Sequence, residues 1–391
     1  MRVLQLHSRY REPGGEDVVV EAEAALLRRH GHEVLQHEVH NPPGALATAG
    51  SLALSPWNPL AARSVQRLAE QARPDVAHVH NTWFALSPAV VWALRRASVP
   101  TVMTLHNYRL VCANAQLFRD GAPCEDCVGA SPWHGVQHRC YRDSVLASLP
   151  AAATIALHDR LRTWARRVDL FLVLNEFARE RFARGGLPPD RIQVKPNFVP
   201  DPGRRSAPAA SSATVLYVGR LSPEKGVEVL VEAWRRLDEG PLELVVIGDG
   251  PLRERLQRRP AVRLRFEGRL PAAEVRRRML EARALVLPSR WYEGQPMVVL
   301  EALAAGLPVL GADIGAVPEL LAPLGRDWLV APGVVASWTE SLRALLDPHR
   351  VEVASARARE HYERSFSAAP AVRALEDAYR RAQASRIGPG P

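Results

Sequence analysis

The feature that most constrains the fold is a strand–helix alternation that occurs twice, once on each side of a proline-rich break. In the break, residues 199–212, proline, glycine and small polar residues follow one another without periodicity. On both sides, short runs rich in β-branched residues alternate with segments of helical period. The pattern predicts an α/β fold of two doubly wound, Rossmann-like parallel sheets that face each other across a cleft. In such sheets, ligands bind at the carboxyl ends of the strands.

Six strands are predicted before the break and six after it. Their ranges are 3–7, 33–39, 75–80, 100–106, 169–174 and 192–195, then 214–218, 242–247, 262–267, 284–287, 308–311 and 328–330. The predicted domains are residues 1–199 and 213–365, with residues 200–212 as the linker. Residues 366–391 are expected to form a closing helix and tail, and the helix is expected to cross back to the first domain.

Length and composition exclude several classes of protein. A chain of 391 residues is about right for two hydrophobic cores. It holds no run of 18 apolar residues, and the run at residues 1–7 is too short for a signal peptide, so we expect a cytoplasmic protein. The net charge of +9 comes almost entirely from arginine, since Lys195 and Lys225 are the only lysines. No helix-turn-helix, recognition-helix zinc finger or aromatic-studded basic strand accompanies this charge, so a nucleic-acid partner is not expected.

One motif in the second half places two cations after a strand. Gly219 permits a tight exit from the strand, and Arg220 and Lys225 follow before the next helix. Two such cations at the carboxyl edge of a sheet can neutralise a diphosphate without a metal ion. The alternative is an ordinary strand–turn–helix junction with solvated charges.

Two further strand ends carry glycine. Gly250 lies in a Gly-Asp-Gly turn, which is weak support for a ligand because such turns also serve packing. Glu267 precedes a glycine at another strand end, where exposed backbone amides could contact a nucleobase.

A pair of carboxylates in the second half is the most specific signal. Glu293 is followed by Gly294 and Pro296, which suit a helix start, and Glu301 comes next to apolar residues. A wholly helical span between the carboxylates would be about 12 Å, roughly the distance from a sugar to a ribose across a diphosphate. The free N–H groups of the helix start would face the phosphates. The alternative is two solvated charges on the surface of a helix.

Two positions in the first half are predicted to face the same ligand. Gly15 belongs to a glycine pair that opens a helix, whose backbone amides can approach a phosphate; a simple packing turn explains it equally well. His106 ends the fourth predicted strand, although a histidine of the core is the commoner outcome for any one of thirteen.

These motifs resemble those of the family 4 glycosyltransferases, which are retaining enzymes of the GT-B fold. The resemblance covers essentially the whole chain and is most specific over residues 217–321. It implies that Arg220 and Lys225 bind the donor diphosphate and that Glu301 holds the ribose hydroxyls. It also implies that Glu293 and His106 contact the donor sugar, with Gly15 at the phosphates. The family often has two glycines where this chain has Gly315-Ala316, so the identity of the sugar does not transfer.

Four cysteines lie within 29 residues, in a segment (112–140) rich in glycine, proline and aromatic residues. Cys112, Cys124, Cys127 and Cys140 include a Cys-x-x-Cys pair, which is typical of half a zinc site. A structural zinc ion would hold the segment in shape without a core. Reduced free thiols and an iron–sulfur or redox role are the alternatives. No metal is expected to take part in catalysis.

Residues 144–167 begin apolar and end with several arginines. This pattern fits a core-packing helix with a solvated basic end. It also fits an interfacial helix on an anionic bilayer, which would place the protein at the inner face of the membrane, where lipid-linked acceptors reside.

The function expected from residues and resemblance together is transfer of a sugar from a UDP- or GDP-linked donor to an acceptor. The acceptor would be a lipid-linked or growing bacterial glycan of a capsule, exopolysaccharide or lipopolysaccharide. The alternatives are a transferase that glycosylates a secondary metabolite, a nucleotide-sugar epimerase of the same fold, and a non-catalytic partner subunit.

Overall fold

The computed structural model describes residues 1–10, 14–237, 240–258 and 261–385. The chain divides into two compact units. The first comprises Met1–Arg119, Cys124–Pro196 and the chain from Ala371 on, and the second comprises Asp120–Pro123 and Asn197–Pro370. Each unit is built on a six-stranded parallel sheet.

The first unit has the strand order β2-β1-β3-β4-β7-β8, and its neighbouring strands are parallel. Its strands are β1 (Arg2–Arg9), β2 (Glu33–His40), β3 (Val76–Asn81), β4 (Thr101–Leu105), β7 (Leu170–Val173) and β8 (Ile192–Val194). Its helices are α1 (Gly15–Arg29), α2 (Ala45–Ala53), α3 (Pro59–Ala72), α4 (Ala89–Arg96), α5 (His134–Gln137), α6 (Val145–Arg160), α7 (Thr163–Arg167) and α8 (Glu176–Arg184). A short hairpin of β5 (Phe118–Arg119) and β6 (Ala122–Pro123) precedes α5.

The second unit has the order β11-β10-β9-β12-β13-β14, again parallel throughout. Its strands are β9 (Thr214–Val218), β10 (Glu243–Ile247), β11 (Leu264–Gly268), β12 (Ala284–Leu287), β13 (Val309–Ala312) and β14 (Leu329–Val330). Its helices are α9 (Val227–Arg235), α10 (Arg253–Gln257), α11 (Ala272–Glu281), α12 (Met297–Ala304), α13 (Val317–Leu321), α14 (Val335–Arg343) and α15 (Pro348–Ser365). Short 3₁₀ turns occur at Pro189–Arg191, Ala209–Ser211, Pro223–Lys225, Ala322–Leu324, Arg326–Trp328 and Ala344–Leu346.

All twelve predicted sheet strands are present, with bounds that shift by two residues at most. Strands such as β12 and β13 are apolar because helices cover both faces of a parallel sheet. In the first sheet, β1 and β3 also carry buried polar residues, among them Gln5, His78 and His80. Shifts of two residues occur at the end of β1 and at the start of β11. At the latter, Arg263 has a φ of +57°, which a strand cannot accommodate.

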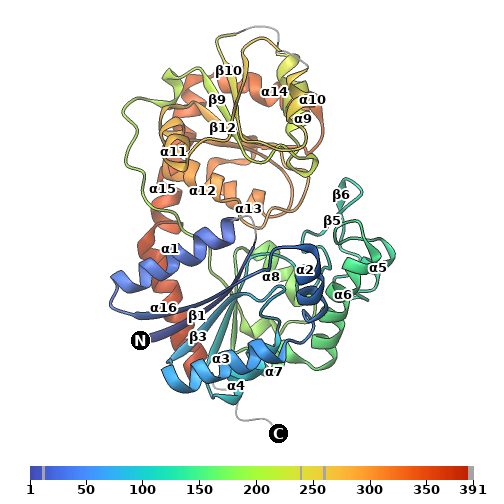
Figure 1. The fold of residues 1–391 in the computed structure, drawn as a ribbon. Helices are drawn as coiled ribbons and strands as arrows, with labels where there is room; N and C mark the ends of the chain where they lie inside the picture. Colours follow the sequence, from blue (N-terminus) through green and yellow to red (C-terminus); the bar gives the residue numbers. More distant parts are fainter. Residues whose placement is uncertain (11–13, 238–239, 259–260, 386–391) are drawn as a thin grey trace. The chain divides into compact units, whose positions relative to one another are not determined.

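The last helix, α16 (Ala368–Ala384), confirms the predicted return of the chain to the first unit. Its residues Leu375 and Tyr379 are buried in one cluster with Val3, Val76 and Val102 of the first sheet. Figure 1 shows α16, in red, beside β1 and β3. The chain therefore completes the core of its first unit with its last helix.

Candidate functional site

Three loops at the carboxyl edge of the second sheet are held together by glycines. A Cβ atom on Gly226 would lie 1.9 Å from the carbonyl oxygen of Pro288, and one on Gly248 would lie 1.9 Å from that of Gly219. Both glycines have a positive φ, +68° and +140°. The loops after β9, β10 and β12 therefore approach one another more closely than side chains would permit.

Gly250 takes part in the same packing. Its Cβ position would lie 2.5 Å from the carbonyl oxygen of Leu221, and its N–H donates to the Asp249 carboxylate at 2.8 Å. The packing role that the sequence left open for this glycine is therefore present.

Lys225 and Glu293 form an ion pair on these loops. The Lys225 ammonium donates to both carboxylate oxygens of Glu293, at 2.8 and 3.1 Å, and lies 4.8 Å from the centre of the Trp291 ring. The Ser289 hydroxyl donates to the same carboxylate at 2.6 Å. Burial alone would raise the pKa of Glu293, but the Lys225 ammonium and the Ser289 hydroxyl hold it below its usual value. Glu293 is therefore ionised at neutral pH.

Lys225 and Glu293 were expected at separate parts of a donor, and their ion pair was not predicted. Ser289 was not predicted as a site residue either, although its position two residues after β12 was the available signal.

Arg220 remains available to solvent on the same edge. Its backbone carbonyl accepts a hydrogen bond from the Tyr217 hydroxyl at 2.8 Å, and its side chain is exposed. The neighbouring Gly219 N–H donates to Ile247 at 3.0 Å, which joins the β9 loop to β10. The guanidinium is thus carried on a loop with a fixed backbone.

Glu301 lies on helix α12, which begins at Met297 after Pro296. Glu293 and Gly294 precede that helix, so the length of a wholly helical span does not give the separation of the two carboxylates. Glu301 is half-buried, and burial raises its pKa, with Arg276 acting in the opposite direction. The start of α12 follows Gln295, whose side chain accepts the Asn197 N–H at 2.6 Å.

Glu267, at the end of β11, is paired with arginines. Its carboxylate lies 3.2 Å from Arg278 and 3.9 Å from Arg265. The adjacent Gly268 carbonyl accepts the N–H of Gly248 at 2.7 Å. The end of β11 is therefore tied to the loop after β10.

In the first unit, His106 directly follows β4 and is hydrogen-bonded to a second histidine. Its Nε2 lies 3.1 Å from Nδ1 of His80, which is buried near the end of β3. The two rings are stacked, with centroids 5.4 Å apart. Burial lowers the pKa of His106 to about 3, so its ring is neutral at neutral pH.

The loop that opens α1 carries Gly15 as the first residue of the helix. Next to it, the Asp17 carboxylate accepts the Gly14 N–H at 2.7 Å and bonds Nε2 of His7 at 2.8 Å. Gly15 is exposed at this helix start.

Glu16 was not predicted as a site residue. Its carboxylate accepts a hydrogen bond from the side chain of Asn107 at 2.6 Å. Asn107 is the residue that follows His106 in the sequence. Burial of the carboxyl group raises its pKa to about 7. Glu16 is therefore a carboxyl group that titrates near neutral pH.

Cys112, Cys124, Cys127 and Cys140 form no disulfide in the structure, and Cys127 is influenced electrostatically by the other three. Burial, then Cys112, raises the pKa of the Cys127 thiol to about 12, with smaller contributions from Cys140 and Cys124. Among the described residues, only Glu23, His78 and His80 bring three potential ligand atoms within 4.8 Å of one another, so no three of the sulfurs are that close. A tetrahedral zinc site would need sulfurs about 3.8 Å apart.

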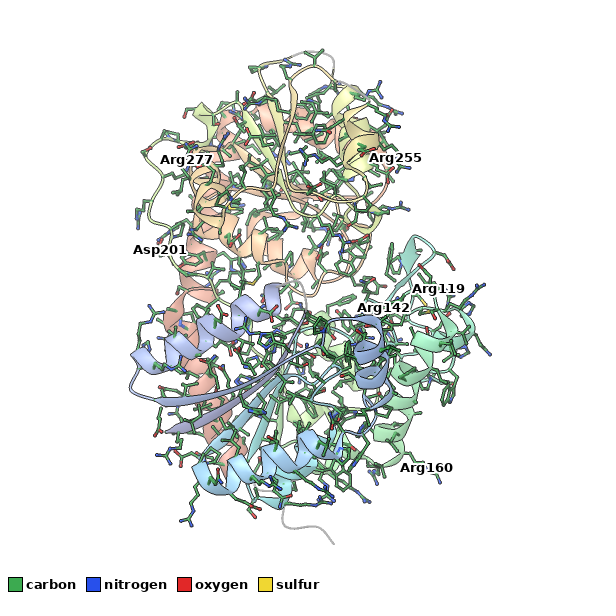
Figure 2. The ribbon with its side chains drawn as sticks, in the orientation of Figure 1. Arg119, Arg142, Arg160, Asp201, Arg255 and Arg277 are labelled. Atoms are coloured by element: carbon green, nitrogen blue, oxygen red, sulfur yellow. The ribbon has the colours of Figure 1, made fainter. Side chains whose placement is uncertain are left out.

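Apolar side chains are exposed on α2 and at the start of α6. Leu46 and Leu146 are 91% and 81% exposed. Between the two helices lies a groove of about 590 Å³, lined by residues that include Leu52, Ala147 and Arg142. Figure 2 shows Arg119 on β5, Arg142 shortly before α6 and Arg160 at the end of α6. Further along α6, Ala151 and His158 are buried, so the helix also packs against the core.

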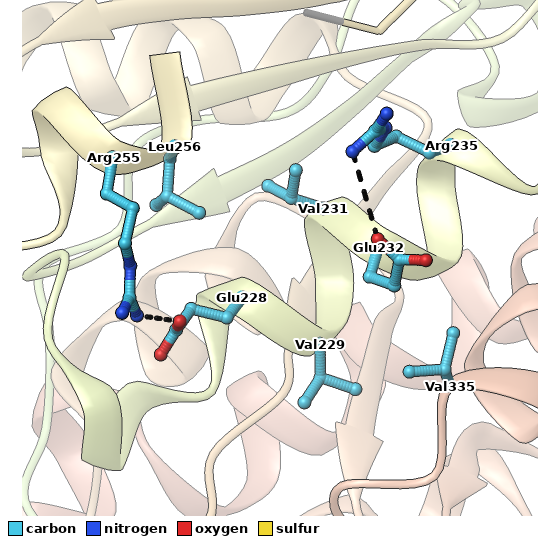
Figure 3. Close-up of a pocket in the computed structure, with 8 residues that line it drawn as sticks. All are labelled: Glu228, Val229, Val231, Glu232, Arg235, Arg255, Leu256 and Val335. Atoms are coloured by element: carbon cyan, nitrogen blue, oxygen red, sulfur yellow. Dashed lines mark hydrogen bonds and ion pairs between the residues drawn. The ribbon is translucent and has the colours of Figure 1, made fainter. Parts of the chain in front are cut away.

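A separate pocket of about 470 Å³ lies in the second unit on α9 and α10. Figure 3 shows two ion pairs at its rim, Arg255 with Glu228 and Arg235 with Glu232, and Val229 and Leu256 among the apolar lining residues. None of the predicted site residues lines it.

None of the helices in the described part of the chain is long and apolar enough to cross a membrane.

Comparisons with known proteins agree with this arrangement. The chain is 28% identical over 372 residues to sulfoquinovosyl transferase SQD2 of Arabidopsis thaliana, covering 90% of this chain and 65% of that protein. It is 29% identical to the putative colanic acid biosynthesis glycosyltransferase WcaL of Escherichia coli, covering 52% of this chain and 54% of WcaL. The chain thus spans less than two thirds of the length of these curated relatives.

A solved structure, Anabaena Alr3699/HepE in complex with UDP, has the same fold. Its TM-score is 0.66 at 19% identity, over 96% of this chain and 99% of that one. The two parallel-sheet units are those of the GT-B fold. The model of glycosyltransferase family 4 matches residues 13–201, and the model of group 1 glycosyl transferases matches residues 212–348. With both of its units matched in this way, the chain belongs to the family 4 glycosyltransferases.

Proposed function

We propose that this protein transfers a sugar from a nucleoside diphosphate donor to a bacterial glycan, with retention of the anomeric configuration. The observation that supports the donor site is the ion pair of Lys225 and Glu293, beside the exposed Arg220, on loops joined by glycines. Structures of HepE hold UDP and UDP-glucose, which supports a nucleotide sugar as the donor. WcaL is named for colanic acid biosynthesis, which supports a glycan as the product.

In the proposed reaction the bond between the anomeric carbon and the departing phosphate oxygen breaks. A bond from that carbon to the acceptor oxygen forms on the same face of the sugar. The proton of the acceptor hydroxyl moves to the departing phosphate oxygen, so atoms and charge balance. Arg220 and Lys225 stabilise the charge that builds on the diphosphate, which is electrostatic catalysis of leaving-group departure. No catalytic metal takes part.

The two carboxylates have different roles in this proposal. Glu301 accepts hydrogen bonds from the ribose hydroxyls. Glu293 binds the donor sugar and holds Lys225 in place until the diphosphate arrives. Neither acts as a general acid or base, because the phosphate itself accepts the proton.

The test incubates the purified protein with UDP- and GDP-linked sugars, without and with glycan acceptors, and follows the products by mass spectrometry. Release of nucleoside diphosphate together with a glycosylated acceptor of retained configuration supports the proposal. An isomerised nucleotide sugar formed without acceptor would identify an epimerase. No turnover and no thermal stabilisation by any donor would identify a non-catalytic subunit.

We also propose that the exposed apolar residues of α2 and α6 dock on an anionic membrane that carries the acceptor. Leu46 and Leu146 supply the apolar contact, and Arg142 and Arg160 supply the positive charge. Liposomes of anionic phospholipid should bind the wild-type protein, and Leu146→Glu should weaken that binding. Leu60→Glu, the same substitution at an exposed leucine of α3, is the control. Equal binding of both variants would contradict the proposal.

We propose in addition that Cys112, Cys124, Cys127 and Cys140 bind one structural zinc ion. The four cysteines lie within one short segment, and three of them influence the pKa of Cys127, which supports this proposal. Zinc would have to draw the sulfurs closer than they lie in the structure to complete a tetrahedron. Metal analysis of protein purified without chelators should find one zinc per chain, and Cys127→Ser should lose it. Protein with no stoichiometric zinc would refute this assignment.

A further inference from the structure

His106 is one end of a buried polar network in the first unit. His80 and His78 lie on β3, Gln5 lies on β1, and Glu23 lies on α1; all four are buried. Lys195, after β8, is also buried and donates to Oε1 of Glu23. The network connects residues of β1, α1 and β3 with His106, which follows β4, and with Lys195, which follows β8.

The network is not arranged to hold a metal, although Glu23, His78 and His80 bring their ligand atoms together. Nδ1 and Nε2 of His78 bond the Tyr379 hydroxyl at 2.9 Å and the Thr104 hydroxyl at 2.7 Å. Both ring nitrogens of His80 also have partners, in His106 and Gln5. Both ring nitrogens of His78 and of His80 are therefore engaged in hydrogen bonds, so neither ring offers a free nitrogen to a metal ion.

A backbone carbonyl fixes the orientation of the Gln5 amide. Nε2 of Gln5 lies 3.4 Å from the carbonyl oxygen of Val20. That oxygen can only accept, so the nitrogen of the amide and not its oxygen must face it. The same nitrogen lies 3.3 Å from Nε2 of His80 and offers its second hydrogen there.

Nε2 of His80 is therefore an acceptor. A hydrogen bond from Nε2 to the Glu23 carboxylate would require a proton on Nε2. The nearest oxygen of that carboxylate lies 3.8 Å from Nε2, which is too far for a hydrogen bond. Burial, and then His106, lowers the pKa of His80 well below 6.5, so the ring is neutral and carries one proton. That proton is on Nδ1, which faces Nε2 of His106 at 3.1 Å.

The geometry points to His80 as a positioning residue that fixes the tautomer of His106. Because Nδ1 of His80 donates, Nε2 of His106 accepts, and the proton of the neutral His106 ring is on Nδ1. Among the described residues, Nδ1 of His106 has no hydrogen-bond partner, and the side chain is only half-buried. His106 therefore presents an N–H group to a ligand at the carboxyl edge of β4.

This tautomer decides what His106 can do, and this step rests on the proposed function. An N–H group donates to a sugar hydroxyl or a phosphate oxygen, and it cannot take a proton from either. His106 thus binds the donor as a hydrogen-bond donor. The alternative tautomer would place a lone pair toward the ligand and would repel phosphate oxygens.

The first test needs no activity. Protein labelled with ¹⁵N at histidine gives two-bond ¹H–¹⁵N spectra that separate the two tautomers and the imidazolium of each ring. The His106 signals are identified by their loss in His106→Gln. At pH 7, Nδ1 of His106 should have the shift of a protonated nitrogen and Nε2 that of an unprotonated one. The opposite assignment, or an imidazolium, would overturn the inference.

The second test changes the partner. His80→Asn keeps an N–H donor near the position of Nδ1, so the tautomer and turnover should be retained within roughly three-fold. His80→Asp offers only an acceptor, so His106 should carry its proton on Nε2 and kcat should fall roughly ten- to hundred-fold. His158→Asn is the control for loss of a buried histidine, since His158 bonds Thr163 and Pro56 and lies outside the network.

The outcomes separate this inference from the proposed function. A wild-type protein without transferase activity whose His106 shows the predicted tautomer would refute the proposed function alone. An active protein in which His80→Asp inverts the tautomer without slowing turnover would refute the positioning role. Loss of turnover in His80→Asn equal to that in His80→Asp, with the tautomer retained, would also refute it.

Discussion

The Lys225 ammonium lies between both carboxylate oxygens of Glu293, at 2.8 and 3.1 Å, although 68 positions separate the two residues. Glu293 is buried and Lys225 is partly open to solvent. In the absence of donor, the pair keeps the lysine extended toward the carboxyl edge of β12 and satisfies the buried carboxylate. In the proposed reaction, the diphosphate of the donor must compete with Glu293 for the same ammonium group.

Replacing Glu293 by glutamine separates its two effects. The amide keeps the shape of the side chain but releases Lys225, so the affinity for nucleoside diphosphate should stay the same or increase. The value of kcat should fall roughly a hundred-fold, because the donor sugar loses its contact with the Glu293 carboxylate. Calorimetric titration with UDP and GDP and initial-rate assays measure both. Glu228→Gln, at an exposed pair on α9, is the control. A large loss of diphosphate affinity in Glu293→Gln would contradict this account.

Removing Glu301 should weaken nucleotide binding by about 1.5–3 kcal/mol, the range for a hydrogen bond to a charged group. Because burial raises the pKa of Glu301, acidification protonates it earlier than an ordinary glutamate and should weaken nucleotide binding. In Glu301→Gln the group cannot titrate, so this part of the pH dependence should disappear. Titrations with nucleoside diphosphate between pH 7 and 5 measure the difference. Identical pH profiles would remove Glu301 from the ribose site.

A methyl group on the loop glycines should destabilise the second unit. Gly248→Ala would place Cβ against the Gly219 carbonyl oxygen at a positive φ, and we expect a loss of about 2–4 kcal/mol in the free energy of unfolding. Gly50→Ala, in α2 with no atom within 4 Å, should instead gain about 0.5–1 kcal/mol. Chemical denaturation measures both. Unchanged stability in Gly248→Ala would show that the loops are not so closely packed.

Lys195 and Glu23 are a fully buried pair. Lys195→Met leaves the carboxylate unpaired and should cost about 3–5 kcal/mol, and adding Glu23→Gln should recover part of that loss. Unfolding of the single and double variants in denaturant measures the coupling. Strictly additive losses would show that the two groups stabilise the fold independently.

Acid should destabilise the first unit from about pH 6.5 downward. His78 and His80 have pKa values well below 6.5, because burial disfavours their charged forms. Below pH 6.5 the unfolded chain therefore binds more protons than the folded one. The free energy of unfolding decreases as the pH is lowered. The slope is up to about 1.4 kcal/mol per pH unit for each histidine. Glu16, whose raised pKa acts in the opposite direction, offsets one such group.

Urea unfolding between pH 6.5 and 5 measures this slope. His349→Gln, at an exposed position at the start of α15, should leave it unchanged. A flat stability over this range in the wild-type protein would show that the buried histidines are not held neutral.

Much of the fold was predictable because the signals are local. Most strands of the two sheets are short runs with several apolar residues, and the segment from Gly219 to Lys225 follows β9 directly. Their place at the carboxyl edge of a sheet therefore follows from the position of β9 alone. The zinc prediction depended only on the sequence spacing of the four cysteines. Sequence spacing does not determine the distances between their sulfur atoms.

The sequence by itself determined two parallel sheets, the family and the edge on which the proposed donor-binding residues lie. Only the tertiary structure decided which of them touch. Lys225 meets Glu293 because β9 and β12 are neighbours in the sheet, and His80 meets His106 because β3 and β4 are neighbours in the other. The tautomer of His106 depends further on Gln5 and Val20, from a strand and a helix elsewhere in the chain. Hydrogen bonds act over about 3 Å, and strand order, which local sequence does not encode, sets which groups come that close.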